Sequence, residues 1–445
     1  MPRLFGTDGV RGTANGDVLT PELAMALAAS AARVLRGERP GRLTVAVGRD
    51  TRPSGPLLEA AAAAGFASEG LDVELLGVVP TPAVAHACAT GAADLGLMIS
   101  ASHNPMPDNG LKLFGPGGAK LADAVEDAVE QGLGAACTRP TGTDVGTVAT
   151  APAERTQAYV TSLLATLEAP LTGLRVVVDC AQGAASHLAP EVYRRAGADV
   201  VAVHADGDGA RINDGTGATH LEALQSAVRE HGADVGLAHD GDADRCLAVT
   251  SDTAGAQVVD GDRILAVCAL GMRERGLLPT GTVVATVMSN LGFVLAMREA
   301  GIEVVQTKVG DRYVLEAMRA GGHALGGEQS GHVVFGGLST TGDGLLTGLQ
   351  LLGRVAATGR SLADLAGVVT VLPQVLVNVR ADRSRAEAPD VLEAVAREEA
   401  SLGETGRVLL RPSGTEPVVR VMVEAPEAAQ ADEVARRLAD VVAGG

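Results

Sequence analysis

Short apolar runs alternate with amphipathic stretches along most of this 445-residue chain, and this alternation limits the fold more than any other feature. The runs 43–47, 73–76 and 95–100 are predicted to be buried strands, and the stretch 57–68 has helical character. Strands that alternate with helices form βαβ units on a largely parallel sheet. We therefore expect an α/β fold.

The same alternation returns twice after residues 138–152, which are rich in Thr, Gly and Pro and are interpreted as a linker. One further unit has strands at 174–180 and 235–238, and the next has strands at 283–287 and 303–307. The final part departs from this order, because its predicted strands and helices do not alternate in the same way. It is interpreted as a smaller α+β domain.

The length of the chain supports a division into several domains, since one hydrophobic core rarely organises so many residues. The predicted architecture is three related α/β domains with mixed, mostly parallel sheets, followed by a smaller C-terminal α+β domain. The predicted boundaries are 1–152, 153–253, 254–370 and 371–445.

The charge of the chain limits its partners. A formal net charge of −18 argues against a nucleic-acid surface and against an anionic membrane, both of which need basic faces. An anionic ligand would therefore need a local group of cations.

The five cysteines form no CxxC pair, no segment has the apolar length of a membrane span, and the first residues lack a signal-peptide pattern. We expect a cytoplasmic protein.

A polar loop or turn follows an apolar strand in each α/β unit, at 100–104, 240–245 and 326–332, and the latter two contain glycine. Open α/β sheets bind ligands in the crevice at the carboxyl ends of their strands. We therefore expect these loops to face a single cleft.

The first of these loops contains Ser102, His103 and Asn104 before a proline. A serine at a strand end can act as a nucleophile or carry a phosphoryl group. Serine and asparagine are also common turn residues, so these residues alone favour an ordinary turn. No G-x-S-x-G pattern surrounds Ser102, which argues against a serine hydrolase.

The second loop places Asp240, Asp242 and Asp244 at alternate positions. Carboxylates without His or Cys are typical ligands of Mg²⁺ and not of zinc. An EF-hand is excluded, because the required glycine and glutamate are missing from its sixth and twelfth positions. A solvated acidic turn is the alternative, but like charges this close repel unless a cation neutralises them. The similar segments 206–208 and 260–262 have two acids each and are interpreted as turns or caps.

Two further loops carry groups suited to a sugar phosphate. The loop 326–332 offers carboxylate, amide and hydroxyl groups for sugar hydroxyls, although it is weak support by itself. The segment 411–417 combines hydroxyls and a flexible glycine with Arg411, and Arg420 follows, so it could hold a phosphate. An ordinary hairpin with solvated arginines is the alternative interpretation.

These loops, in this order and at these intervals, resemble the α-D-phosphohexomutase superfamily. The resemblance covers nearly the whole chain, from the Phe-Gly-Thr-Asp-Gly-Val-Arg-Gly segment at 5–12 to residues 411–423. The Gly-Glu-Gln-Ser-Gly-His loop and the Thr-Thr-Gly-Asp-Gly segment at 340–344 are most similar to bacterial members that act on an amino-sugar phosphate. One departure is Ala243, which stands where glycine is usual in a turn that favours positive φ.

The resemblance implies a phosphoserine enzyme that moves a phosphoryl group on a hexosamine phosphate through a 1,6-bisphosphate. It implies that Ser102 carries the phosphoryl group and that Mg²⁺ is held by the phosphorylated Ser102 with Asp240, Asp242 and Asp244. The general base would be Lys112, provided that its pKa is lowered, or else His103. The implied substrate-binding residues are Arg11, Arg245, Glu328, Ser330, Arg411, Ser413, Gly414, Thr415 and Arg420.

Other functions stay open at this point. A phosphomannomutase or phosphoglucomutase would use the same chemistry on another sugar, and a metal-dependent phosphatase would admit water to the phosphoserine. A non-catalytic sugar-phosphate sensor should have lost Ser102 or one of the aspartates, and this chain keeps them all. The expected partner is a small sugar phosphate. A homodimer is an expectation that the sequence does not test.

Overall fold

The structure is a computed structural model, and it describes all residues except 1, 2, 7, 38, 40, 252–254, 413–416 and 445. Packing divides the chain into two compact units. One unit consists of Met1–Met288 and Glu303–Gly367, and the other consists of Ser289–Ile302 and Val368–Gly445. The first unit contains three successive α/β domains, each with its own sheet.

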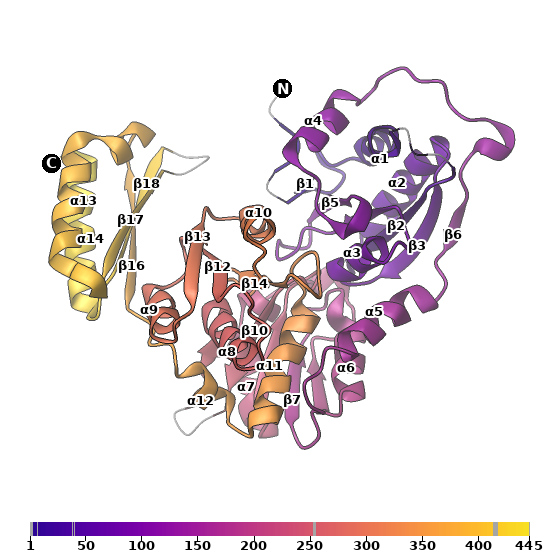
Figure 1. The fold of residues 1–445 in the computed structure, drawn as a ribbon. Coiled ribbons are helices and arrows are strands. Elements are labelled where there is room, and N and C mark those ends of the chain that lie inside the picture. Colours follow the sequence, from indigo (N-terminus) through magenta and orange to yellow (C-terminus); the bar gives the residue numbers. More distant parts are fainter. Residues whose placement is uncertain are drawn as a thin grey trace. The chain divides into compact units, whose positions relative to one another are not determined.

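The first domain has a six-stranded sheet in the order β1-β5-β4-β2-β3-β6 (Figure 1). Its strands are β1 (Val10–Thr13), β2 (Thr44–Arg49), β3 (Asp72–Val78), β4 (Leu95–Ile99), β5 (Asp108–Phe114) and β6 (Val148–Thr150). Its helices are α1 (Pro21–Arg36), α2 (Gly55–Ser68), α3 (Thr81–Ala89) and α4 (Asp123–Gln131), with short 3₁₀ turns at Pro116–Gly118 and Gly142–Asp144. The region interpreted as a linker therefore contains a strand, because β6 pairs with β3 in parallel.

Both faces of this sheet are covered, which explains its continuous apolar strands. Val47 and Leu97 belong to an apolar cluster with buried side chains of α1 and α2. On the opposite face the glycines Gly48 and Gly96 lie against α3, where a Cβ atom would approach Val84 to 2.6 and 2.8 Å. The small residues of the strands thus let α3 pack close to the sheet.

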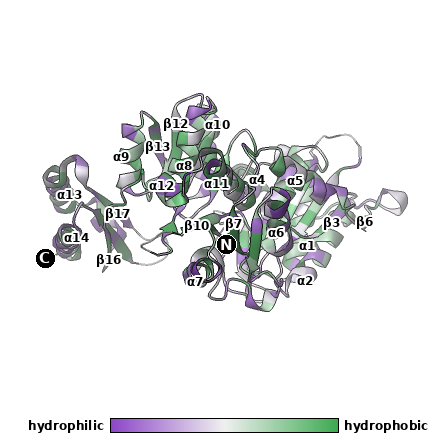
Figure 2. Ribbon diagram, turned by 90° about the horizontal axis from the view of Figure 1, so that it is seen from below, coloured by the Kyte–Doolittle hydropathy of each residue, from purple (hydrophilic) through white to green (hydrophobic). Residues whose placement is uncertain are grey.

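The second domain has a five-stranded sheet in the order β11-β10-β9-β7-β8. Its strands are β7 (Arg175–Asp179), β8 (Asp199–Val203), β9 (Val235–His239), β10 (Cys246–Thr250) and β11 (Val258–Val259). Its helices are α5 (Glu154–Leu164), α6 (Ala185–Arg195) and α7 (Glu222–His231), with 3₁₀ turns at Gly209–Arg211 and Gly217–Thr219. The three consecutive valines of β7 are fully buried, as expected for a central strand covered on both faces. Figure 2 shows β7 and β10 mainly in the hydrophobic colour.

The third domain has a four-stranded sheet in the order β13-β12-β14-β15. Its strands are β12 (Thr282–Thr286), β13 (Glu303–Thr307), β14 (Leu325–Gly327) and β15 (Val333–Phe335). Its helices in the first unit are α8 (Gly261–Glu274), α10 (Asp311–Gly321), α11 (Gly344–Thr358) and α12 (Leu362–Ala366). The helix between β12 and β13 packs with the second compact unit.

The three domains share one topology. In each, four strands that are successive in the chain lie in the spatial order fourth, third, first, second, and the fourth strand is antiparallel to the third. These sets are β2–β5, β7–β10 and β12–β15. The hairpin between the third and fourth strands holds Ser102 in the first domain, the three aspartates in the second and Glu328 in the third. The prediction of three related α/β domains is confirmed.

The second compact unit contains a three-stranded antiparallel sheet in the order β16-β18-β17. Its elements are α9 (Leu291–Glu299), β16 (Gln374–Arg380), α13 (Pro389–Leu402), β17 (Arg407–Pro412), β18 (Val418–Glu424) and α14 (Ala428–Ala443), with 3₁₀ turns at Arg383–Glu387 and Gly403–Thr405. The buried carboxylate of Glu424 accepts hydrogen bonds from the Leu291 amide and the Arg407 side chain, which ties α9 to the sheet. The smaller α+β domain is thereby confirmed.

No helix in the described parts of the chain combines the length and the apolar character needed to cross a membrane.

Candidate active site

Ser102 lies in the tight loop between β4 and β5, and its side chain is buried. Its φ angle of 52° is in the left-handed region, which residues other than glycine adopt infrequently. The Oγ atom donates a hydrogen bond of 2.6 Å to Asp240 Oδ2 and lies 3.2 Å from His103 Nδ1. This backbone conformation therefore directs the hydroxyl of the first domain toward the aspartates of the second.

Two side chains that the sequence analysis missed hold this loop in place. Arg52 is fully buried, and each of its five N–H donors has an acceptor. Those acceptors are the Asp50 carboxylate and the carbonyl oxygens of Ser102, Asn104, Pro105 and Asp108. Asn213, from the second domain, donates to the Ser102 and Asn104 carbonyls at 2.9 and 3.0 Å. Arg52 lies three residues after the end of β2, so a polar residue in the turn after a strand was the available signal.

Replacing Asn213 with alanine should therefore lower turnover by about tenfold, because a small displacement of the Ser102 loop is costly in a reaction that depends on alignment. Asn213 also has a positive φ of 59°, where alanine is strained. Asn15→Ala is the matched control, because exposed Asn15 has a φ of 58° and imposes the same backbone strain. Steady-state kinetics and thermal unfolding of both variants would check this. Equal kinetic losses would show that backbone strain alone is responsible.

The three aspartates of the predicted metal loop are buried and lie close together. Ligand oxygens of Asp240, Asp242 and Asp244 all lie within 4.8 Å of one another. Ala243 has a φ of 56°, so alanine occupies the positive-φ turn that was expected at this position. A Cβ atom on Gly241 would come within 2.5 Å of the Ser102 carbonyl oxygen. The metal loop therefore packs directly against the Ser102 loop.

The donor atoms of these aspartates fit a divalent cation. Asp242 Oδ1 and Asp244 Oδ1 are buried and, among the described residues, have no hydrogen-bond partner. Burial, together with repulsion from Asp244 and Asp242, raises the pKa of Asp240 well above its usual range. A hard cation with oxygen ligands would satisfy the unpaired atoms and offset this repulsion. The set of donors suits Mg²⁺.

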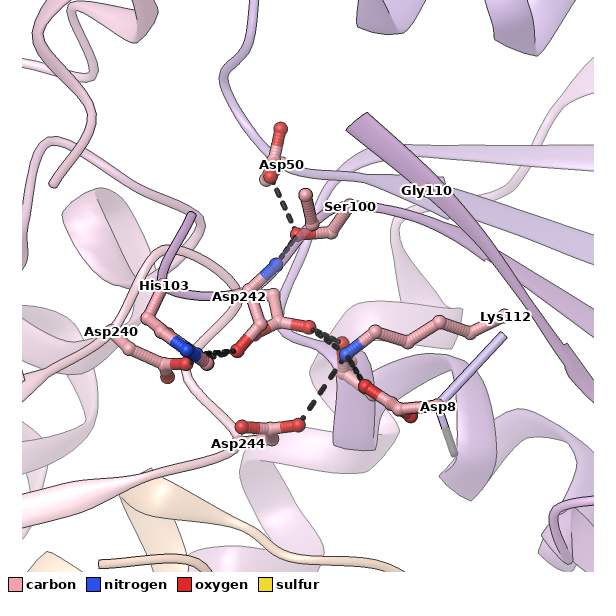
Figure 3. A network of polar contacts seen from close by, with 12 residues as sticks. Asp8, Asp50, Ser100, His103, Gly110, Lys112, Asp240, Asp242 and Asp244 are labelled. Atoms are coloured by element: carbon pink, nitrogen blue, oxygen red, sulfur yellow. Dashed lines mark hydrogen bonds and ion pairs between the residues drawn. The ribbon is translucent and has the colours of Figure 1, made fainter. Parts of the chain in front are cut away.

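Lys112 lies on β5 and extends toward the same aspartates (Figure 3). Its Nζ atom is 2.7 Å from Asp242 Oδ2, 2.8 Å from Asp8 Oδ2 and 3.5 Å from Asp244 Oδ2. Burial lowers the pKa of Lys112, but Asp242 and Asp8 outweigh it and raise the pKa above its ordinary value. A general base requires a lowered pKa, so this condition is not met here. The arrangement suits a permanent cation.

His103 has the opposite electrostatic environment. Burial, together with the positive charges of Arg245 and Arg11, lowers the pKa of His103 to about 4. Its imidazole is therefore neutral near pH 7, and His103 lies beside the Ser102 hydroxyl.

A cavity of about 390 Å³ borders these groups and is lined by all three α/β domains. Its polar walls include Asp8, Arg11, His103, Arg245, Glu328 and His332. The expectation that the three loops face one cleft is met. Arg11 and Arg245 also supply the local positive charge that an anionic ligand needs in so acidic a protein.

The sugar-loop residues have different environments. Glu328 borders the cavity, and its Oε1 accepts a hydrogen bond from the Gly310 amide. Gln329 donates to Asp260, the N-cap residue of α8, at 3.2 Å, so its amide anchors the loop. The Oγ atom of Ser330 is buried and has no hydrogen-bond partner among the described residues.

The predicted phosphate-binding loop belongs to the C-terminal unit. Arg411 on β17 lies directly opposite Arg420 on β18, and such antiparallel partners present their side chains on one face of the sheet. Ser413, Gly414 and Thr415 lie outside the described residues.

Comparison with known proteins extends these observations to the whole chain. The four phosphoglucomutase/phosphomannomutase domains match in order: α/β/α domain I at residues 2–137, domain II at 157–255, domain III at 260–371 and the C-terminal domain at 376–441. The chain belongs to the phosphoglucomutase/phosphomannomutase family. It is therefore a mutase that transfers phosphoryl groups, an enzyme of the isomerase class, and the resemblance to the α-D-phosphohexomutases is confirmed.

Individual proteins of known name or structure are similar to this chain over nearly its whole length. The phosphoglucosamine mutase of Frankia casuarinae is 64% identical over 99% of this chain and 98% of its own length. That of Saccharopolyspora erythraea is 61% identical over 100% and 99%. A phosphoglucomutase/phosphomannomutase family protein from Burkholderia thailandensis, 25% identical, has a TM-score of 0.81 with coverage of 100% and 98%. N-acetylphosphoglucosamine mutase of Aspergillus fumigatus, solved with GlcNAc-6P and magnesium, shares the fold at 20% identity, with a TM-score of 0.68 and coverage of 99% and 96%.

Proposed function

We propose that this enzyme interconverts glucosamine 6-phosphate and glucosamine 1-phosphate through a phosphoserine at Ser102 and a 1,6-bisphosphate intermediate. The observation that carries the proposal is the contact of 2.6 Å between Ser102 Oγ and the buried aspartate cluster, beside a cleft with arginines in its wall. The amino sugar is supported by relatives named phosphoglucosamine mutase at 57–64% identity over the full length.

In the first half of the reaction the phosphorylated Ser102 gives its phosphoryl group to the free hydroxyl of the bound sugar phosphate. The bond from Ser102 Oγ to phosphorus breaks, and a bond from the sugar oxygen to phosphorus forms. The sugar hydroxyl loses a proton, and neutral His103 is the proposed acceptor because the carboxylates around Lys112 keep that side chain charged. Phosphoryl transfer asks the protein mainly for alignment and stabilisation of charge, which Arg11, Arg245 and the ammonium of Lys112 would supply.

In the second half the bisphosphate turns over, and its other phosphoryl group returns to Ser102. The phosphate that is not reacting must be held in both orientations. Arg411 and Arg420 are the proposed contacts, because arginine binds phosphate through paired hydrogen bonds. Ser413, Gly414 and Thr415 complete the proposed loop. Ser330 is proposed to bind the sugar through its unpaired hydroxyl.

Mg²⁺ is the proposed cofactor, held by Asp240, Asp242 and Asp244 together with the phosphate on Ser102. Such an ion would neutralise the charge of about −1.5 to −2 that a phosphoserine brings at neutral pH. The magnesium bound in the Aspergillus fumigatus enzyme, which has the same fold, supports this assignment.

Glucosamine phosphate is expected to be the preferred substrate. Glu328 borders the cleft and can pair with the ammonium group of an amino sugar, whereas glucose and mannose leave its charge unpaired. The values of kcat/KM for the 1-phosphates of glucosamine, glucose and mannose would test this, and we expect the glucosamine value to be highest by about tenfold or more. A higher value for glucose or mannose would leave the mutase chemistry and reject the glucosamine assignment.

A further inference from the structure

Oppositely charged side chains alternate along one side of the cleft. Lys112 pairs with Asp242 on one side and with Asp8 on the other, at 2.7 and 2.8 Å. Lys120 then pairs with the second oxygen of Asp8, at 2.5 Å, and with Asp311. The row thus runs from the metal-loop aspartates of the second domain, through the first domain, to α10 of the third.

Within this row, Lys120 joins the first and third domains. It lies between β5 and α4, and its side chain is only 9% exposed. Asp8 belongs to the N-terminal segment that also carries Arg11, and Asp311 lies in the first turn of α10. Burial lowers the pKa of Lys120, but Asp311 and Asp8 raise the pKa above its ordinary value, so the side chain stays charged.

The two carboxylates that Lys120 neutralises both border the cavity. Asp8 shares its charge among Arg11, Lys112 and Lys120, so the loss of Lys120 would strengthen its pull on the other two. Asp311 would keep the hydrogen bond from the Arg312 amide, at 2.7 Å, and His332, whose Nε2 is 3.6 Å away, but among the described residues no lysine or arginine side chain would pair with it. An unpaired carboxylate in this wall would also repel a bound phosphate, because charges interact strongly where water is excluded.

We propose that Lys120 is a positioning residue for phosphoryl transfer: by pairing with Asp8 and Asp311 it fixes Lys112 and Arg11 at the reacting end of the cleft. This inference rests on the proposed mutase function. Lys120 does not touch the aspartates of the metal loop, so it acts through Asp8. Its removal should therefore disturb alignment and also leave Asp311 uncompensated, and these two effects can be separated.

The test replaces Lys120 with methionine and Asp311 with asparagine, each alone and both together, in the full-length enzyme. In Lys120→Met, kcat should fall by about ten- to a hundredfold, because catalytic groups displaced by about 1 Å cost this much, and KM should rise. The double variant should recover the wild-type KM, because the uncompensated charge is gone, while its kcat should stay low. This split between kcat and KM would not follow from a general loss of stability.

Arg436→Met is the matched control, since it removes one cation from an exposed ion pair with Asp432 and should change neither constant. If Lys120→Met fails to fold, the double variant still carries the test, because it leaves no unpaired charge at Asp311. A Lys120→Met enzyme with wild-type kcat, or a double variant whose losses are the product of the single ones, would overturn the inference alone. A wild-type protein without mutase turnover would overturn the proposed function and this inference with it.

Discussion

The Ser102→Ala enzyme should lose mutase turnover by at least about 10⁴-fold, because it has no oxygen on which to carry the phosphoryl group. Incubation with glucose 1,6-bisphosphate should add one phosphoryl group to the wild-type protein and none to the variant, as measured by intact mass. The fold should persist, because the change from serine to alanine adds no atom and keeps the Cβ that this backbone, with a φ of 52°, already carries. The loss should therefore be chemical.

Ser226→Ala provides the control for the substitution itself. Ser226 is exposed on α7, and its hydroxyl bonds to the Glu222 carbonyl and to a neighbouring arginine. That variant should keep full turnover and should still be phosphorylated. An active Ser102→Ala enzyme, or a stable phosphoryl group mapped to another residue, would refute the phosphoserine assignment.

The parts of the fold that could be predicted are those indicated by short local sequence patterns. The parallel strands of each α/β domain are short apolar runs bounded by turns, and such runs are recognisable without knowledge of their partners. The antiparallel strand that completes each set was not predicted. In β5 it contains Asn109, Gly110 and Lys112, which are poor strand residues although all three are buried.

The sequence indicated the loops of the site but not the side chains that orient them. Ser102 and the aspartates stand in short motifs whose composition has a chemical meaning. Arg52 and Asn213 contact the Ser102 loop from 50 and 111 residues away in the chain, and Asp311 meets Lys120 across 191 residues. Such contacts depend on how the domains pack, and no local pattern encodes them.

The surroundings of the titratable and polar side chains could not be predicted from the sequence either. Lys112 could be proposed as a base only on the condition that neighbouring cations or burial lowered its pKa. The structure instead surrounds it with carboxylates from Asp8 and the metal loop, which raise the pKa. In the same way, Gln329 stands in a sugar-binding motif, but its amide bonds to Asp260 at the start of α8.

After the loss of Ser102, the loss of a carboxylate from the aspartate cluster should have the largest effect on turnover. Asp242 accepts hydrogen bonds through Oδ2 from Thr81 and from Lys112, while its Oδ1 has no partner among the described residues. In Asp242→Asn one amide oxygen can keep one of these bonds, but the negative charge is gone. The NH₂ group of the new asparagine would then point at Lys112 or at the cation, and either contact is unfavourable because it brings a hydrogen-bond donor to a positive charge.

Asp242→Asn should therefore weaken Mg²⁺ binding at least about tenfold, since affinity follows the number of charged ligands. Turnover should fall by about 10²–10³-fold, because a metal ion supplies several kcal/mol of charge stabilisation in phosphoryl transfer. Calorimetric titration with Mg²⁺ and kinetics over a range of Mg²⁺ concentrations would measure both. Asp208→Asn is the matched control, because exposed Asp208 stands in a similar Asp-Gly-Asp segment, where it caps a 3₁₀ turn and pairs with Arg211. That variant should behave as wild type, and wild-type activity that survives excess EDTA would refute the role of the metal.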